Sequence, residues 1–136
     1  MINLIANIIL NKCLIYFIIS VNTGSSVRTV AVHPTKSELF VCAARYGTCM
    51  LFDMRGKNDS KNLIQPLTKL MGHTKSISSA FFSPLTGEKL ATVCYDNKIR
   101  IYDLKEQKAE KNPSVAFYHN NNTGRWLSTF KVTEFF

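Results

Sequence analysis

The sequence predicts an all-β fold made of two repeated units, each with four short antiparallel strands. The first observation is a repeat: residues 27–55 align without a gap with residues 77–105, at a constant offset of 50. Secondly, short runs of β-branched and aromatic residues alternate with turn residues in both copies. Thirdly, each copy ends on an aromatic residue followed by aspartate, at Phe52-Asp53 and Tyr102-Asp103.

In the first unit, turn residues separate four apolar runs. A proline turn follows the first run, a tight turn follows the second, and the polar linker GKNDSKN precedes the fourth. The expected strands are Val27–Val32, Leu39–Ala44, a run ending at Asp53, and residues 66–71.

The second unit repeats this order, with Pro84 in the place of Pro34 and KEQKAEKN as the polar linker. The expected strands are Ile77–Phe82, Lys89–Cys94, a run ending at Asp103, and Val115–Tyr118. A third unit opens near GRWLSTFKV and is cut off within its first strand. We therefore divide the chain into an apolar segment (1–21), two repeat units (22–71 and 72–118) and the start of another (119–136).

Residues 1–20, MINLIANIILNKCLIYFIIS, differ in composition from everything after Gly24. Four interpretations stay open. A transmembrane helix is disfavoured by the asparagines and Lys12 near its middle, and a signal peptide by the missing basic start and cleavage site. The segment could also form a strand over residues 14–19 that completes a preceding unit, or be foreign to the fold. We favour the last, and expect membrane contact only if residues 2–19 form a helix.

Composition limits the classes of function. Apolar residues make up 46% of the chain and charged residues only 19%, which predicts a folded core rather than disorder. The net charge of +8 favours polyanions such as nucleic acid without conferring specificity. The four cysteines form no CxxC pair, so we expect buried thiols in a reducing compartment and no metal site. No nucleophile elbow, glycine-rich phosphate loop or HExxH motif is present, so we expect no enzyme, no cofactor and no small-molecule substrate.

The stretch GHTKSISSAFFSP…LATVCYDNKIRIYD resembles a WD repeat in its Gly-His opening, its aspartate in a turn and its aromatic-Asp ending. The resemblance implies a partial WD-repeat β-propeller, with two four-stranded blades and the start of a third. It also implies a structural tetrad, in which Asp96 accepts a hydrogen bond from the His73 imidazole. That ring in turn meets the Thr92 hydroxyl and Tyr102, so these residues are structural rather than catalytic. In the first copy Tyr46 takes the aspartate position, so that blade relies on packing or uses its turn for something else.

A narrower resemblance is carried by SVRTVAVHP, HTKSISSAFFSPLTG and HNNNTGRWLSTF. These stretches are similar to the damage-specific DNA-binding WD-repeat proteins, over roughly residues 22–130. The resemblance implies a nuclear, chromatin-associated protein acting in the response to DNA damage. Because a closed propeller has typically about four to eight blades, we expect a fragment or truncated isoform of marginal stability.

The endings FDMR and YDLK are similar to the box by which WD-repeat substrate receptors dock onto the adaptor of cullin-4 ubiquitin ligases. An arginine held near the blade aspartate would present a planar donor fork to a partner. Alternatively, each basic residue only pairs with the aspartate before it. The candidate docking residues are Asp53, Arg55, Asp103 and Lys105, with Lys105 the weaker of the two basic ones.

The stretch HNNNTGRWL, residues 119–127, lies where damage-binding relatives insert a hairpin into the duplex. Arg125 suits a phosphate or a guanine edge, and Trp126 suits an unstacked base. Alternatively, Trp126 begins the next buried strand and the asparagines form a plain turn. The candidate DNA-binding residues are Arg125, Trp126, Asn120, Asn121, Asn122 and, from the other inter-blade loop, Lys75.

Two hypotheses of function follow. The first is a binding module that contacts DNA or chromatin and recruits a ubiquitin-ligase adaptor. The second is a general protein-interaction scaffold without affinity for nucleic acid. DNA binding that weakens steeply with salt would favour the DNA-binding module over the protein-interaction scaffold.

Overall fold

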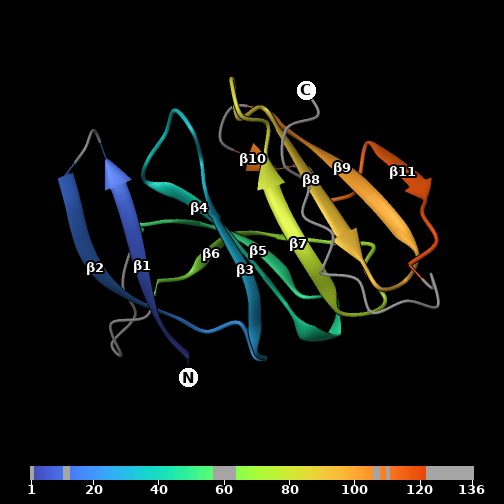
Figure 1. Cartoon of the computed structure of the whole chain (residues 1–136), viewed down its shortest axis with the longest axis horizontal. Coiled ribbons are helices and arrows are strands. Elements are labelled where there is room, and N and C mark those ends of the chain that lie inside the picture. The colour runs from blue at the N-terminus through green and yellow to red at the C-terminus, as the bar shows by residue number, and fades with distance from the viewer. Residues whose placement is uncertain (1, 11–12, 57–63, 106–107, 110, 122–136) are drawn as a thin grey trace.

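The computed structural model of the chain describes residues 2–10, 13–56, 64–105, 108–109 and 111–121, with side chains from residue 21 onward except at 105–110. In this part the fold is all-β (Figure 1), as expected. The described strands form three antiparallel sheets, and one short 3-10 turn, η1 (Arg45–Gly47), lies between two neighbouring strands of the same sheet. No helix among the described residues has the length and hydrophobicity needed to cross a membrane.

The first blade is a four-stranded antiparallel sheet in chain order. Its strands are β3 (Val27–Val32), β4 (Leu39–Ala44), β5 (Cys49–Asp53) and β6 (Pro66–Leu70). The strands expected for this unit are confirmed, the last being one residue shorter than predicted. All six side chains of β4 are buried, because this strand lies inside the sheet and is covered on both faces.

The second blade repeats this arrangement. Its strands are β7 (Ile77–Phe82), β8 (Lys89–Cys94), β9 (Lys98–Lys105) and β11 (Val115–Tyr118), with the short β10 (Lys108–Ala109) beside the end of β9. Both copies also shift register at the same repeat position, between Val27 and Thr29 and between Ile77 and Ser79. This shared irregularity shows that the repeat extends to backbone geometry.

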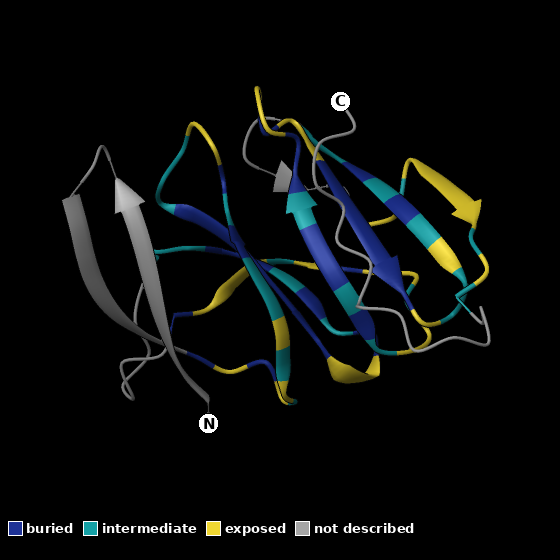
Figure 2. Cartoon of the chain, in the orientation of Figure 1, coloured by how far each residue is buried: buried dark blue, intermediate teal, exposed yellow. Residues whose placement is uncertain are grey.

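The two blades share one core, because their first strands, β3 and β7, lie side by side (Figure 1). The Thr29 hydroxyl donates a hydrogen bond of 3.0 Å to the carbonyl of Ser78, which links these strands. Buried residues run through the middle strands of both blades (Figure 2). The core combines Ala31, Val41, Ala43, Cys49, Leu51 and Leu70 of the first blade with Ile77, Ala80, Phe82, Leu90, Cys94 and Tyr102 of the second.

Two glycines with positive φ allow close contact between the blades at opposite ends of their interface. A Cβ atom on Gly47 (φ +72°) would lie 2.5 Å from the carbonyl oxygen of His73. A Cβ atom on Gly87 (φ +71°) would overlap the ring of His33. That ring is buried and packs against Phe82, with 5.0 Å between ring centroids. Neither glycine can therefore carry a side chain without moving a histidine of the neighbouring blade.

The N-terminal segment is a β-hairpin of β1 (Ile2–Leu10) and β2 (Cys13–Val21). The helical interpretation of this segment is wrong. A strand was one of the alternatives, but β2 is longer than residues 14–19 and pairs with β1 instead of completing a blade. At its end Val21 is fully buried and forms a parallel bridge with Ile64 beside the first blade. It belongs to a second, smaller core cluster with Phe40, Cys42, Phe52 and Ile64. That the segment is foreign to the fold stays a prediction.

Three of the four cysteines, Cys42, Cys49 and Cys94, are buried free thiols, as expected. Burial raises the pKa of Cys42 to about 12, so this thiol stays protonated and unreactive at neutral pH. Within the described ranges no group of histidine, cysteine and carboxylate side chains could hold a metal ion.

Candidate binding surfaces at the two ends of the blades

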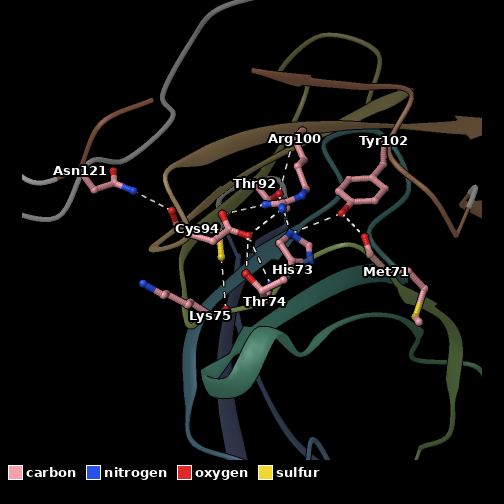
Figure 3. A network of polar contacts seen from close by, with 10 residues as sticks. Met71, His73, Thr74, Lys75, Thr92, Cys94, Arg100, Tyr102 and Asn121 are labelled. Atoms are coloured by element: carbon pink, nitrogen blue, oxygen red, sulfur yellow. Dashed lines mark hydrogen bonds and ion pairs between the residues drawn. The ribbon is translucent and has the colours of Figure 1, made fainter. Parts of the chain in front are cut away.

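A polar network around His73 joins the loop between the blades to the second blade (Figure 3). The His73 Nε2 atom lies 2.9 Å from the Thr92 hydroxyl, which donates a longer bond of 3.5 Å to the Arg100 carbonyl. The Tyr102 hydroxyl lies 3.4 Å from the same nitrogen and donates a 2.6 Å bond to the Met71 carbonyl. The structure therefore brings together the histidine, threonine and aromatic members of the expected tetrad.

The expected hydrogen bond from His73 to Asp96 is not formed. His73 Nδ1 is buried and has no hydrogen-bond partner among the described residues. Instead, Arg100 donates two bonds to the Asp96 carboxylate, of 3.0 Å from Nη1 and 2.6 Å from Nη2. The backbone N–H and hydroxyl of Thr74 also donate to it, over 3.3 and 3.2 Å. A guanidinium in fork geometry binds a carboxylate more strongly than a neutral imidazole does, which explains the exchange of partner.

The electrostatics of this network suit an anchor rather than an acid–base site. Burial, aided by the charge of Arg100 and opposed by that of Asp96, lowers the pKa of His73 to about 4. Burial alone would raise the pKa of Asp96, but hydrogen bonds from Arg100 and Thr74 hold it well below its usual range. The network thus contains a neutral imidazole and a neutralised ion pair. A general-base histidine would need a pKa near the working pH.

The loops at one end of both blades form a continuous surface, here termed the hairpin end. It comprises residues 22–26, 45–48, 71–76, 95–97 and 119–121. Backbone hydrogen bonds link these loops, from Arg45 to Ser26 over 3.1 Å and from Tyr95 to Ser76 over 2.9 Å. Loop η1 and strand β7 are also in contact, and η1 is among the exposed parts of the chain (Figure 2). The carbonyl of Lys75 accepts a bond from Cys94 Sγ, and Lys75 itself is exposed.

Carboxylates are unevenly distributed between the two ends of the blades, whereas cations lie at both, with Lys36, Arg55 and Lys89 at the end opposite the hairpin end. The exposed cations at or next to the hairpin end include four that belong to no ion pair among the described residues: Arg28, Arg45, Lys75 and Lys98. The described carboxylates at the opposite end are Glu38, Asp53, Glu88 and Asp103. Asp96 is the one described carboxylate at the hairpin end, and Arg100 neutralises it. Of these cations, Lys75 could be predicted from the sequence, whereas the other three could not, because they are dispersed along the chain.

The predicted DNA-binding stretch is described only in its first part. The Asn121 side chain donates a 2.7 Å bond to the Cys94 carbonyl, and its backbone N–H donates to the Asn97 side chain over 3.1 Å. Asn121 therefore fixes the loop to the β8–β9 turn with the amide group that was expected to contact DNA. Asn120 is exposed at the same end. The other candidates, Asn122, Arg125 and Trp126, lie outside the described residues and stay predictions.

At the opposite end, Arg55 is held by two carboxylates. It donates to Asp53 from Nε over 3.2 Å and from Nη2 over 3.0 Å, and its backbone N–H donates over 2.8 Å. Nη2 also lies 3.3 Å from Glu38. These hydrogen bonds from Arg55 lower the pKa of Asp53. The side chain is 62% exposed, and Nη1 takes part in no bond among the described residues, so the pairing leaves a donor for a partner.

The equivalent position of the second blade differs. Asp103 pairs with Lys89 over 3.4 Å, on the neighbouring strand. The side chain of Lys105 lies outside the described part of the structure, and its role stays a prediction.

The repeated four-stranded blades and the His73 network define a protein of the β-propeller class, built from WD repeats. Residues 64–103 match the family model WD40, described as WD domain, G-beta repeat. The expected membership of the WD-repeat family is thus confirmed.

The chain is similar to WD repeat-containing protein 76 of Xenopus laevis, with 45% identity over 79% of this chain and 18% of the relative. The mouse protein of the same name is 38% identical over 78% of this chain and 17% of its own length. Protein DAMAGED DNA-BINDING 2 of Arabidopsis thaliana is 33% identical over 80% of this chain and 18% of the relative. The chain is therefore a WD-repeat protein related to DNA damage-binding proteins, and it spans less than a fifth of the length of these relatives.

Proposed function

We propose that this chain is a non-enzymatic binding module that holds DNA at its hairpin end and docks a ubiquitin-ligase adaptor at the opposite end. The observation that carries the proposal is the unpaired positive charge of the hairpin end, where Arg100 neutralises the one described carboxylate. The names of the relatives, which include damaged DNA-binding proteins, support the same ligand. A nuclear, chromatin-associated location follows from this function.

The hairpin end suits a phosphate backbone. Each phosphate that a cation neutralises releases counterions, so log K falls against log salt with a slope of about −0.9 per phosphate on duplex DNA. If Arg28, Arg45, Lys75 and Lys98 each engage one phosphate, the slope is about −3 to −4. Because these contacts read no base edge, the described surface accounts for affinity and orientation rather than for sequence preference.

Fluorescence anisotropy of a labelled duplex over a series of salt concentrations tests the DNA-binding function. Arg45→Ala and Lys75→Ala are each expected to weaken binding and to reduce the salt slope by about 1. Lys89→Ala is the matched control, because it removes an exposed cation at the opposite end. If the wild-type chain binds neither duplex nor single-stranded DNA at low salt, the DNA-binding function is wrong.

Adaptor docking rests on the geometry of Arg55. Asp53 and Glu38 hold its guanidinium in place, so a partner would lose little side-chain entropy on binding to the free Nη1 edge. The proposed partner is the adaptor of a cullin-4 ubiquitin ligase. Co-purification from cells should fall with Arg55→Ala and with Arg55→Lys, which lacks the planar fork. Equal yields from wild type and Arg55→Ala would exclude this role of Arg55.

A general protein-interaction scaffold is the second candidate function. The outer strand β11 favours it, because all four of its side chains are exposed, including Phe117 at 53% and Tyr118 at 75%. Such an apolar strand suits a peptide or protein partner. Two results together would favour this function over the first. Proteins would be captured by the wild-type chain but not after replacement of Phe117 and Tyr118, and the chain would have no affinity for duplex DNA.

A further inference from the structure

Tyr46 occupies an unfavourable position for its residue type. It lies in the hairpin turn between β4 and β5, which closes with a 3.3 Å hydrogen bond from the Thr48 N–H to the Arg45 carbonyl. Its backbone is left-handed, with φ 58° and ψ 31°, a conformation that bulky L-residues rarely adopt. Its side chain is 82% exposed. The aromatic ring therefore gains little burial that could offset the strained backbone.

The repeat shows that this turn has lost a structural role. In the second blade the equivalent residue is Asp96, which fixes the turn through Arg100 and Thr74. In the first blade the equivalent loop, residues 22–26, is joined to the turn through the backbone of Arg45, whose N–H donates to the Ser26 carbonyl over 3.1 Å and whose carbonyl accepts a 3.0 Å bond from the Ser25 hydroxyl. The side chain at position 46 is thereby free to face solvent.

The surroundings of Tyr46 are cationic. Arg45 precedes it and is exposed, and Lys75 projects from the loop that His73 anchors beside the turn. The charge of Asp96 is neutralised by its bidentate bond with Arg100. An exposed aromatic face flanked by cations is the combination with which proteins bind single-stranded nucleic acid, since bases stack on the ring and phosphates contact the cations.

We propose that Tyr46 is a stacking platform for an unpaired nucleobase, and that Arg45 and Lys75 hold the phosphates on either side of it. This inference rests on the proposed DNA-binding function and specifies its ligand as a strand with unstacked bases. An acidic peptide would use the two cations but would not need an exposed ring in a strained turn, so the nucleic acid is the favoured ligand.

The test compares two labelled ligands on the full chain, an oligothymidylate of about 12 nucleotides and a duplex of equal length. Tyr46→Ala is expected to weaken binding of the oligothymidylate by about 5- to 100-fold and of the duplex by less than about twofold. Tyr46→Phe should keep the affinity. Tyr46→Asn suits the left-handed turn, so it should fold at least as well as wild type and still lose affinity. Leu85→Ala is the matched control, because it removes another apolar side chain, 78% exposed, at the opposite end.

A readout specific for stacking is the quenching of 2-aminopurine placed within the oligothymidylate. Quenching by wild type and by Tyr46→Phe, but not by Tyr46→Asn, is the expected result. If the wild-type chain binds DNA and Tyr46→Ala changes neither affinity nor quenching, the stacking role is wrong while the DNA-binding function stands. If the wild-type chain binds neither the oligothymidylate nor the duplex, both the stacking role and the DNA-binding function are wrong. An acidic peptide that binds more tightly than oligothymidylate, and only when Tyr46 is present, overturns the inference in favour of a protein ligand.

Discussion

Replacing Arg100 with methionine removes one partner of a buried ion pair. The side chains of Arg100 and Asp96 are only 4% and 7% exposed, and two bonds of 2.6 and 3.0 Å join them. Methionine is flexible and fills much of the space of the arginine stem, so the change tests the lost charge more than a cavity.

The expected loss in free energy of unfolding follows from the groups that remain around Asp96. Of the hydrogen bonds described above, the carboxylate keeps the two longer ones from Thr74, of 3.3 and 3.2 Å. Leaving one charge of a buried pair without its partner costs about 3–5 kcal/mol. Native domains have a free energy of unfolding of about 5–15 kcal/mol, so this is a large fraction of the total. With a urea m-value of about 2 kcal/mol per M, the midpoint of unfolding should fall by about 1.5–2.5 M.

Urea titration followed by circular dichroism near neutral pH measures this loss. The double variant Asp96→Asn with Arg100→Met removes both charges, and should be more stable than the sum of the single variants by at least about 1 kcal/mol. In wild type the folded pKa of Asp96 is lowered, so the pair stabilises the fold above the ordinary carboxyl pKa, and this stability is lost as pH falls below it. A loss below about 1 kcal/mol in Arg100→Met, or simple additivity in the double variant, would refute the reasoning.

Three further predictions concern turns and pH. Gly47→Ala should lower the free energy of unfolding by about 2–3 kcal/mol or more, because its Cβ would meet the His73 carbonyl at 2.5 Å and its φ is +72°. Gly24→Ala is the control: its φ is +70° but open space surrounds it, so the loss should be only about 1 kcal/mol. Equal losses of the two variants in urea titrations would contradict this prediction. Tyr46→Asn should stabilise the fold by about 0.5–1 kcal/mol, since asparagine tolerates left-handed backbone, and a lower melting temperature would count against it. Because burial lowers the pKa of His73 from 6.5 to about 4, the unfolded state binds the proton more tightly, and stability should decline as pH falls from about 6.5 to about 4. His73→Gln should make the free energy of unfolding less dependent on pH in this range. A smaller dependence should remain from His33, because burial lowers the pKa of that residue too. If the pH dependence is the same in wild type and variant, His73 is not its source.

The strands of both blades could be predicted from the sequence because their signals are local and occur twice. A gapless repeat fixes the position of each run, and the alternation of apolar residues and the turn residues then fix its ends. The N-terminal hairpin was harder to predict, because a long aliphatic run supports a helix or a strand equally well. Its high isoleucine content was the signal for strands.

The partner of Asp96 was missed for a different reason. In the run KIRIY the apolar residues Ile99 and Ile101 suggest the buried face, but Arg100 and Tyr102 are the buried ones. A buried tyrosine defines the inward positions of the strand, and Arg100 shares its side because strand side chains alternate with period two. A cation at such a position requires a carboxylate, and Asp96 lies just across the turn.

The close contacts of Gly47 with His73 and of Gly87 with His33 have a consequence for how the molecule opens. They bring the two blades into close contact at both ends of their interface, so the blades cannot separate at either end without losing packing that both of them share. Arrays of repeats commonly unfold one unit at a time. Here the two blades should exchange their amide protons together, and the smallest cooperative folding unit is the pair.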